Sequence, residues 1–517
     1  MRIQNSIKNM VFGLSGQIIS MAIGIIVRTV FIYTLGVEYL GVEGLFTSIL
    51  LMLSLANLGF DTAIIYSLYK PLAENDVCKI QALMNLYRNA YRIIGVIVLI
   101  IGLSLFPFLP YLMNGETNIN NIDLIYLLFL IQSVSSYYFA YKHSVIIADQ
   151  RNHVISKIHS VFIIVSNFTQ IILLLTVSNY ILILTIQIGF RIFENIYIRN
   201  KADELYPYLK ARNNASLTSK DKKQFYENLY SLFLYRISGV VINGTDNIII
   251  STFVGIAWVG IYSNYLLIIT TITTFLGYFF YSVTASVGNL NVNESKEKKH
   301  FIFRVINFTN FWLYGFCTVC LWNLVNPFIS LWLGEQYLLN KFIVFTILLN
   351  FYTTGMQNAS TTFRETTGLF KKGKYRPVIA ALINICVSII LTQLIGISGV
   401  FLGTVISRLC TFFWYDPYII FKNVFHRPIK FYYLKYIFFI MLVIGSCIIS
   451  NFIISYMHVN NSLINLVIGG IVCLIVPNFL FFLIFRKSHE FIYLWNIVKL
   501  LTNNVSTTLF NKKNYNL

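Results

Sequence analysis

Apolar runs of about 20 residues or more recur along the whole chain, and only short polar segments separate them. A run of this length, coiled as an α-helix, crosses a hydrocarbon layer about 30 Å thick. Charged residues make up 11% of the 517 residues, against about 25% in soluble globular proteins. The runs are continuous rather than alternating in segments of about ten residues, which argues against a β-barrel. The sequence therefore predicts an all-α polytopic membrane protein.

The hydropathy pattern predicts about 14 transmembrane helices. The expected spans are 9–35, 44–69, 84–113, 122–148, 154–178, 180–200, 229–254, 259–288, 302–332, 341–367, 376–396, 399–422, 431–457 and 463–485. An even number of spans puts both termini on the same side of the membrane. Both termini are basic, which predicts that this side is the cytoplasm.

The positive charge of the chain follows the same topology. Its net charge is +19, and nearly all 39 lysines and arginines fall in alternate loops. The basic loops lie around Lys79, Arg151, Lys222, Lys298, Lys372 and Arg427. This placement is typical of a multi-pass membrane protein whose basic loops face the cytoplasm and anionic lipids, and it argues against nucleic-acid binding.

The sequence also contains an internal repeat. LGVEYLGVE at Leu35–Glu43 recurs as VGIAWVGIY at Val254–Tyr262, an offset of 219 residues. A second match pairs Arg191 with Arg408 at an offset of 217. Because both halves start on the same side, we expect parallel repeats about an axis along the membrane normal.

The repeat and the spans together predict two pseudo-symmetric six-helix lobes followed by two extra helices. The expected divisions are an N-terminal lobe at 1–201, a cytoplasmic connector at 202–228, a C-terminal lobe at 229–425, spans thirteen and fourteen at 426–486, and a cytoplasmic tail at 487–517. The last two spans have no counterpart in the repeat.

Four of the arginines within the expected spans are candidates for a site: Arg28, Arg191, Arg236 and Arg408. A charge at the bilayer centre costs about 2.5–3.5 kcal/mol on insertion scales, so such residues usually face protein or water. Each arginine could instead be structural, with Arg28 pairing with Asp246 and Arg191 with Glu194. For the set we favour a cationic cavity, in which the guanidinium groups bind the phosphate or other acidic groups of an anionic ligand.

Polar residues beside these arginines are candidates for gating or ion coupling. Asp246, Thr245 and Asn247 lie together in the seventh span, and Asn57 and Asp61 lie in the second. Asp61 sits close to the inner end of its span, which also suits a solvated or capping group. We expect no cofactor, with H+ or Na+ as candidate coupling ion.

No enzyme motif is present in the sequence. It has neither a glycine-rich phosphate loop with its lysine nor an HExxH motif, so we expect a transporter rather than an enzyme. Cys317 and Cys320 have CxxC spacing but lie within an apolar run. We interpret them as core thiols, and we expect no metal site.

Several segments carry a family resemblance. The segments GVEYLGVEGLFTSILLMLSLANLGF, YRIIGVIVLIIGLSLFPFLPYLM, SSYYFAYKHSVIIADQ and GTDNIIISTFVGIAWVGIYSNY resemble Wzx-type polysaccharide repeat-unit flippases. These flippases belong to the multidrug/oligosaccharidyl-lipid/polysaccharide (MOP) exporter superfamily. Many relatives have a glutamate after LSLA, where this chain has Asn57.

The resemblance implies a fold and a substrate. The fold is a MATE-like V of two six-helix lobes, often with two extra helices. The substrate is an oligosaccharide on undecaprenyl diphosphate, flipped by alternating access for O-antigen, capsule or exopolysaccharide synthesis. A polysaccharide polymerase and a chain-length regulator would be partners.

Other functions stay open at this point. A lipid II flippase of the same superfamily is the nearest alternative, and a multidrug/cation antiporter is a third. A membrane glycosyltransferase or polymerase would need a large extramembrane loop with carboxylates, and the longest outer loop, around Asn114 to Asp123, is short.

Overall fold

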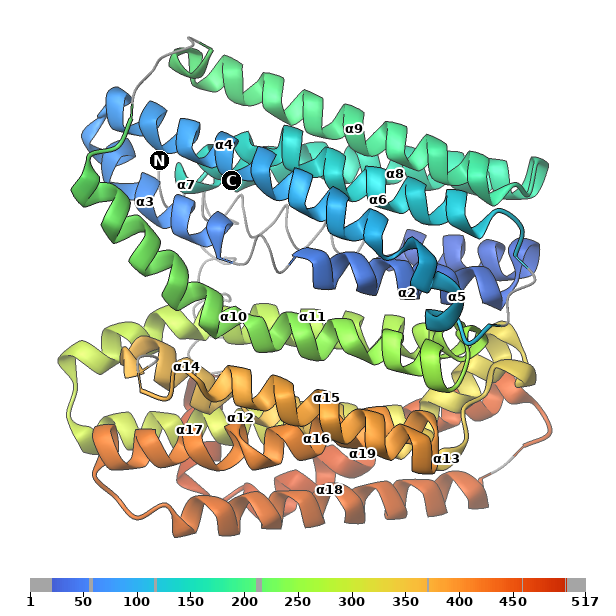
Figure 1. Cartoon of the computed structure of the whole chain (residues 1–517). Helices are drawn as coiled ribbons and strands as arrows, with labels where there is room; N and C mark the ends of the chain where they lie inside the picture. Colours follow the sequence, from blue (N-terminus) through green and yellow to red (C-terminus); the bar gives the residue numbers. More distant parts are fainter. Residues whose placement is uncertain are drawn as a thin grey trace, which may run out of the picture. The chain divides into compact units, whose positions relative to one another are not determined.

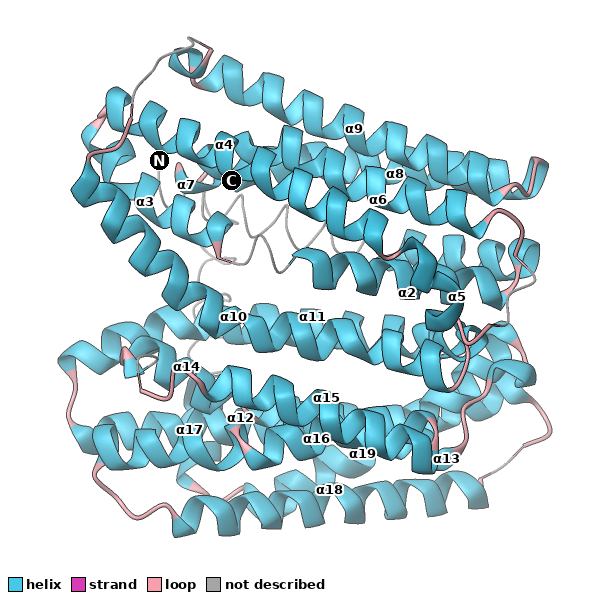
Figure 2. Cartoon of the chain, in the orientation of Figure 1, coloured by secondary structure: helices cyan, strands magenta, loops and turns pink. Residues whose placement is uncertain are grey.

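The computed structural model describes residues 21–54, 59–115, 119–210, 216–369, 372–457, 459–497 and 499, and no described residue forms a β-strand (Figure 2). The helical residues Met21–Leu35 come first (Figure 1). The following helices are α2 (Val37–Leu53), α3 (Phe60–Glu74), α4 (Val77–Ser104), α5 (Leu109–Leu112), α6 (Ile122–Phe139), α7 (His143–Ala148), α8 (Asn152–Thr176), α9 (Tyr180–Leu205), α10 (Ser219–Phe253), α11 (Ile256–Asn293), α12 (Lys296–Leu333), α13 (Lys341–Met356), α14 (Asn358–Thr366), α15 (Arg376–Ile395), α16 (Ile397–Cys410), α17 (Phe412–Ile420), α18 (Lys430–Tyr456) and α19 (Ser462–Phe485).

The expected fold class, an all-α polytopic membrane protein, is confirmed. Within the described residues, ten helices are long and apolar enough to cross a membrane. An eleventh results if Met21–Leu35 and α2, between which the chain bends by 120°, count as one broken span. Other expected spans are not among these helices because they are too short or too polar. For example, α13 has only 16 residues before a break, and α10 carries many polar residues along its length.

Helix boundaries differ from the expected loops at two places. Helix α2 begins at Val37 rather than at residue 44, so the repeated glycine segment is helical. Helix α10 begins at Ser219, inside the expected connector 202–228. The hydroxyl of Thr218 caps this helix by accepting a hydrogen bond from the amide of Asp221 at 3.2 Å.

The chain divides into two compact units. The first comprises Met1–Ser263 and Lys374–Gly403, and the second comprises Asn264–Gly373 and Thr404–Leu517. In the first unit, α10 packs against α2 and α15, and α6 packs against α4 and α9. In the second unit, α12 packs against α13, α18 and α19.

Aromatic packing joins the two C-terminal helices to α12. The ring of Phe311 on α12 stacks on Phe439 of α18 at 4.0 Å between centroids, and it lies 4.7 Å from Phe481 of α19. All three side chains are buried, and stacked pairs of this kind add about 0.5–1.5 kcal/mol beyond their buried area. The final two helices are therefore a packed part of the second unit.

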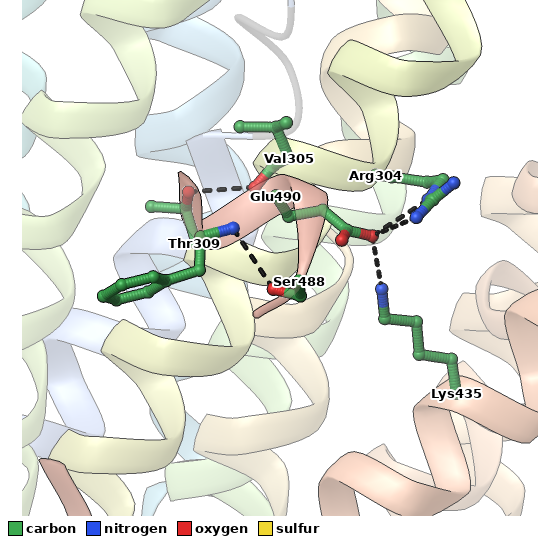
Figure 3. A network of polar contacts seen from close by, with 7 residues as sticks. Arg304, Val305, Thr309, Lys435, Ser488 and Glu490 are labelled. Carbon is green, nitrogen blue, oxygen red and sulfur yellow. Dashed lines mark hydrogen bonds and ion pairs between the residues drawn. The ribbon is translucent and has the colours of Figure 1, made fainter. Parts of the chain in front are cut away.

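A buried ion network holds the segment that follows α19. The carboxylate oxygen Oε1 of Glu490 accepts hydrogen bonds from Arg304 Nε (2.9 Å), Arg304 Nη2 (2.7 Å) and Lys435 Nζ (2.6 Å) (Figure 3). Burial alone would raise the pKa of the Glu490 carboxyl. The hydrogen bond and charge of Lys435, with further bonds from Arg304, outweigh burial and hold this pKa at about 2.

This network predicts how the docking of residues 489–497 depends on pH. The pKa of Glu490 is below its ordinary 4.5 when the segment is docked. The carboxylate therefore stabilises docking fully above about pH 4.5, and this contribution is lost as the pH falls toward about 2. Amide hydrogen exchange of the segment should be constant from pH 7 to about 5, after correction for intrinsic rates. In Glu490→Gln the exchange should be faster already at pH 7. Equal protection in both proteins at pH 7 would contradict this role of Glu490.

Candidate functional site

Two glycines make the sharp turns of the sequence repeat. Gly36 (φ +90°) separates Met21–Leu35 from α2, and Gly255 (φ +126°) lies in the turn between α10 and α11. Residues with a Cβ rarely adopt these backbone angles. Each glycine therefore lets one helix end and the next begin within one or two residues.

The two turns pack against each other reciprocally within the first unit. A Cβ on Gly41 would lie 2.1 Å from the carbonyl oxygen of Ile256, and a Cβ on Gly260 would lie 2.2 Å from that of Val37. Gly41 and Gly260 are 219 residues apart, as are Val37 and Ile256. Contacts in which equivalent residues exchange partners are the mark of a two-fold axis, here a pseudo-two-fold axis.

The same exchange relates two polar contacts. Arg28 Nη1 donates to Ser263 Oγ at 2.9 Å, and Asn247 Nδ2 donates to the Gly44 carbonyl at 3.3 Å. Arg28 and Asn247 are equivalent at the offset of 219, and so are Gly44 and Ser263. Asn247 also donates to Ser48 Oγ at 3.0 Å. We call the set of residues in these reciprocal contacts the seam: Arg28, Val37, Gly41, Gly44, Asn247, Ile256, Gly260 and Ser263.

Glu43 is the acidic partner of the seam, and it was missed in the sequence. Its carboxylate lies within electrostatic range of Arg28, but its oxygens are more than 4.0 Å from the guanidinium nitrogens, so the two groups form no direct ion pair. Tyr39 and Tyr180 lie close to it, with their rings edge to face at 5.1 Å. Protein surrounds Glu43 closely, yet its side chain keeps an accessible surface.

The other polar residues of α10 lie next to the seam. Thr245 is buried and donates to the Val241 carbonyl at 2.8 Å, with Asn384 Oδ1 of α15 at 3.4 Å. Asp246 lies within electrostatic range of the buried Tyr262. The side chain of Arg236, on the same helix, lies outside the described part of the structure.

Arg191 lies in a separate pocket of about 240 Å³ between α6, α8 and α9. It donates to Glu194 Oε2 at 3.0 Å, and His159 Nδ1 lies 2.6 Å from Glu194 Oε1. This arginine is therefore balanced by a carboxylate three residues away. The polar wall of the pocket consists of Gln132, Ser166, Asn167 and Gln187.

The remaining candidates lie elsewhere. Arg408 is half-buried in the second unit, and its Nη1 donates to Gln357 Oε1 at 3.3 Å, where α13 and α14 meet. Asp61 lies in the first turn of α3 and accepts hydrogen bonds from the hydroxyls of Tyr87 and Tyr91. Asn57 lies outside the described residues.

Of the nine residues singled out in the sequence, the structure brings Arg28 and Asn247 into the seam, with Thr245 and Asp246 as their neighbours on α10. Glu43 and Ser263 complete this site. A signal for both existed, because Glu43 lies within the repeated LGVEYLGVE segment and Ser263 directly follows its copy. Reading the segment as a loop hid that signal.

No protein-family model matches the chain, and no curated protein matches it. Solved structures do match. The chain resembles "Lipid II flippase MurJ, inward closed conformation" with a TM-score of 0.64 and 18% identity, over 92% of this chain and 99% of that one. It resembles an inward-facing multidrug resistance MATE family transporter of the MOP superfamily with a TM-score of 0.58 and 13% identity, over 78% of this chain and 96% of that one. A structure of the MATE multidrug transporter DinF-BH matches with a TM-score of 0.58 and 15% identity, over 83% of this chain and 96% of that one. At these identities the likeness establishes the fold that this chain shares with MurJ and the MATE transporters.

Proposed function

We propose that the protein is a flippase of the MOP superfamily. It moves an oligosaccharide linked to undecaprenyl diphosphate from the cytoplasmic to the outer leaflet of the bacterial cell membrane by alternating access, for surface polysaccharide synthesis. Both termini face the cytoplasm, and H+ or Na+ is the candidate coupling ion. The polysaccharide polymerase and the chain-length regulator act on the product outside the membrane.

The observation that carries this proposal is that the charge of Arg28 is not balanced by a direct ion pair. Its hydrogen-bond partner, Ser263, is neutral, and no carboxylate among the described residues lies within the 4.0 Å ion-pair limit of its guanidinium. A diphosphate cannot cross about 30 Å of hydrocarbon unless other groups replace its hydration. A half-buried guanidinium supplies paired donors for that purpose, because its planar fork matches phosphate oxygens.

The seam supplies the gate that alternating access requires. The backbones on the two sides of the seam touch at Gly41 and Gly260, which have no side chains. The two sides can therefore move apart there as rigid surfaces. The polar contacts of Arg28 and Asn247 lie directly beside the glycines. Opening the seam breaks the bond from Arg28 to Ser263 and frees the guanidinium for the diphosphate. After the diphosphate has left, Glu43 can balance the charge of Arg28 or take up a coupling proton.

Two observations support a flippase over a drug antiporter. The MurJ structure matches 92% of this chain, whereas the two MATE transporter structures above match 78% and 83% of it. The packed α18–α19 pair and the guanidinium group of Arg28 also suit a long lipid with an anionic head. The MurJ match favours lipid II as the second candidate substrate, since it shares the polyprenyl diphosphate and differs in its sugar.

Deletion of the gene tests this function directly. We expect the deleted strain to lose surface polysaccharide and to accumulate an undecaprenyl-diphosphate oligosaccharide in the cytoplasmic leaflet, measured by mass spectrometry of extracted lipids. Restoring the gene on a plasmid should reverse both effects. Accumulation of lipid II with normal polysaccharide would assign the second substrate instead. Normal polymer with no accumulated lipid would contradict both.

A further inference from the structure

A larger cavity opens in the second unit, remote in sequence from the seam. Its volume is about 470 Å³, and it lies between α12, α18 and the π-helical turn η7 (Phe421–Phe425). Ligand pockets in proteins are typically about 300–1,000 Å³. The cavity is therefore large enough for a lipid headgroup, and the function proposed above does not use it.

The walls of the cavity combine aromatic rings with cations. Phe303, Phe421 and Tyr432 are buried in its wall, and Phe431 is 73% exposed at its edge. An exposed apolar ring beside basic residues suits contact with both parts of an anionic lipid, its acyl chains and its headgroup. The cations that line the cavity are Arg304, Arg427 and Lys435.

Glu490 binds two of these cations but neutralises only one positive charge. Arg304 and Lys435 converge on a single oxygen of this buried carboxylate, which balances one of their two charges (Figure 3). Within the described residues, Arg427 has no carboxylate inside the 4.0 Å ion-pair limit. The cavity thus offers an excess of positive charge to a ligand. Since a phosphodiester carries one negative charge, it offsets part of that excess.

Asn307 supplies a second, independent sign of a ligand. Its side chain is only 4% exposed and lines the cavity, yet its Oδ1 atom has no hydrogen-bond partner. Burial of an unsatisfied polar atom is costly, and most such atoms are paired in native proteins. A ligand with a hydroxyl group next to its phosphate would satisfy this oxygen.

We propose that this cavity binds the headgroup of an anionic glycerophospholipid of the surrounding membrane. The phosphate lies against Arg427 and the remaining donors of Arg304 and Lys435, and a headgroup hydroxyl donates to Asn307 Oδ1. The apolar chains leave the cavity past Phe431. Phosphatidylglycerol has this combination of phosphodiester, hydroxyl and acyl chains. An undecaprenyl phosphate has the charge but lacks the hydroxyl-bearing carbons of the headgroup.

The test measures lipid retention by native mass spectrometry of the full-length protein. The probes are phosphatidylglycerol, phosphatidylcholine of the same acyl chains, and undecaprenyl phosphate. We expect retention of phosphatidylglycerol to fall about tenfold in Arg427→Gln and in Asn307→Leu, as for loss of one hydrogen bond to a charged or buried group. Lys430→Gln is the matched control, because it removes an exposed charge next to the cavity without lining it, and it should bind like the wild type.

Three results would overturn the proposal. The first is unchanged retention of phosphatidylglycerol in Arg427→Gln, whose exposed position leaves folding intact. The second is equal retention of phosphatidylcholine, since its headgroup has no hydroxyl and no net charge. The third is displacement of phosphatidylglycerol by equimolar undecaprenyl phosphate, which would assign the cavity to the carrier lipid.

Discussion

Gly41→Ala is expected to abolish transport while the protein is still made and inserted. The added Cβ would lie 2.1 Å from the carbonyl oxygen of Ile256, and a backbone oxygen cannot rotate away as a side chain can. Overpacking of this kind costs about 1–3 kcal/mol or more, which shifts the balance between closed and open seam by about 5- to 150-fold. Transport is measured as surface polysaccharide per cell, normalised to protein level.

The repeat provides a second variant and a control. Gly260→Ala should have the same effect, because its Cβ would meet the Val37 carbonyl oxygen at 2.2 Å. The double variant should be little worse than either single variant, since one overlap already opens the shared contact. Gly24→Ala is the control, with no atom within 4 Å of the added Cβ.

A labelling measurement separates a gate from a folding defect. A cysteine at the buried seam position Ile256, in a protein without its seven native cysteines, should react slowly with maleimide when Gly41 is present and faster in Gly41→Ala. Wild-type transport by both glycine variants would contradict the seam as a gate.

Loss of the charge at Arg28 is the second large effect. Arg28→Gln should reduce transport by about 10- to 100-fold, because hydrogen bonds to charged groups contribute about 1.5–3 kcal/mol. Arg28→Lys should retain part of the activity, since lysine keeps the charge but lacks the planar fork. The measurements are surface polysaccharide and the amount of lipid-linked sugar left in the cytoplasmic leaflet.

The pseudo-symmetry gives a sharper test of what Arg28 does. The double variant Arg28→Asn, Asn247→Arg moves the guanidinium to the equivalent position of the other half. If the arginine serves the substrate, the exchange should recover part of the transport that Arg28→Asn loses. If it serves only to balance Glu43, the exchange should recover none. Lys70→Gln, which removes an exposed charge in a surface pair with Glu74, is the control and should leave transport unchanged.

The fold could be predicted from the sequence because its main signals are long-range averages. Apolar runs and alternating basic loops identify a helical membrane protein without any contact being known. The two repeated glycines at Gly36 and Gly255 also predicted the relation between the halves. The sequence could not show that α2 starts at Val37. One residue with positive φ is enough to turn the chain, whereas a hydropathy profile spreads that turn over many residues.

The site was harder to predict, because the place of a residue in the sequence does not show which other residue its side chain will contact in the fold. The pair Arg191 and Glu194 was foreseen, since three residues along a helix bring side chains together. His159, from another helix, reaches the same carboxylate and had no local signal. Glu43 was overlooked for the opposite reason, because the segment that contains it looked like a turn. The seam became visible only when helices far apart in sequence were seen in contact.

The exchange of partners across the seam has one more consequence. In a dimer of identical chains, any change at position 28 would appear on both sides of the axis at once. Here both sides belong to one polypeptide, so each can vary alone, and arginine stands at 28 where its mate, 247, is asparagine. The two sides of the seam therefore differ in charge, with a guanidinium group on one side and a neutral amide on the other.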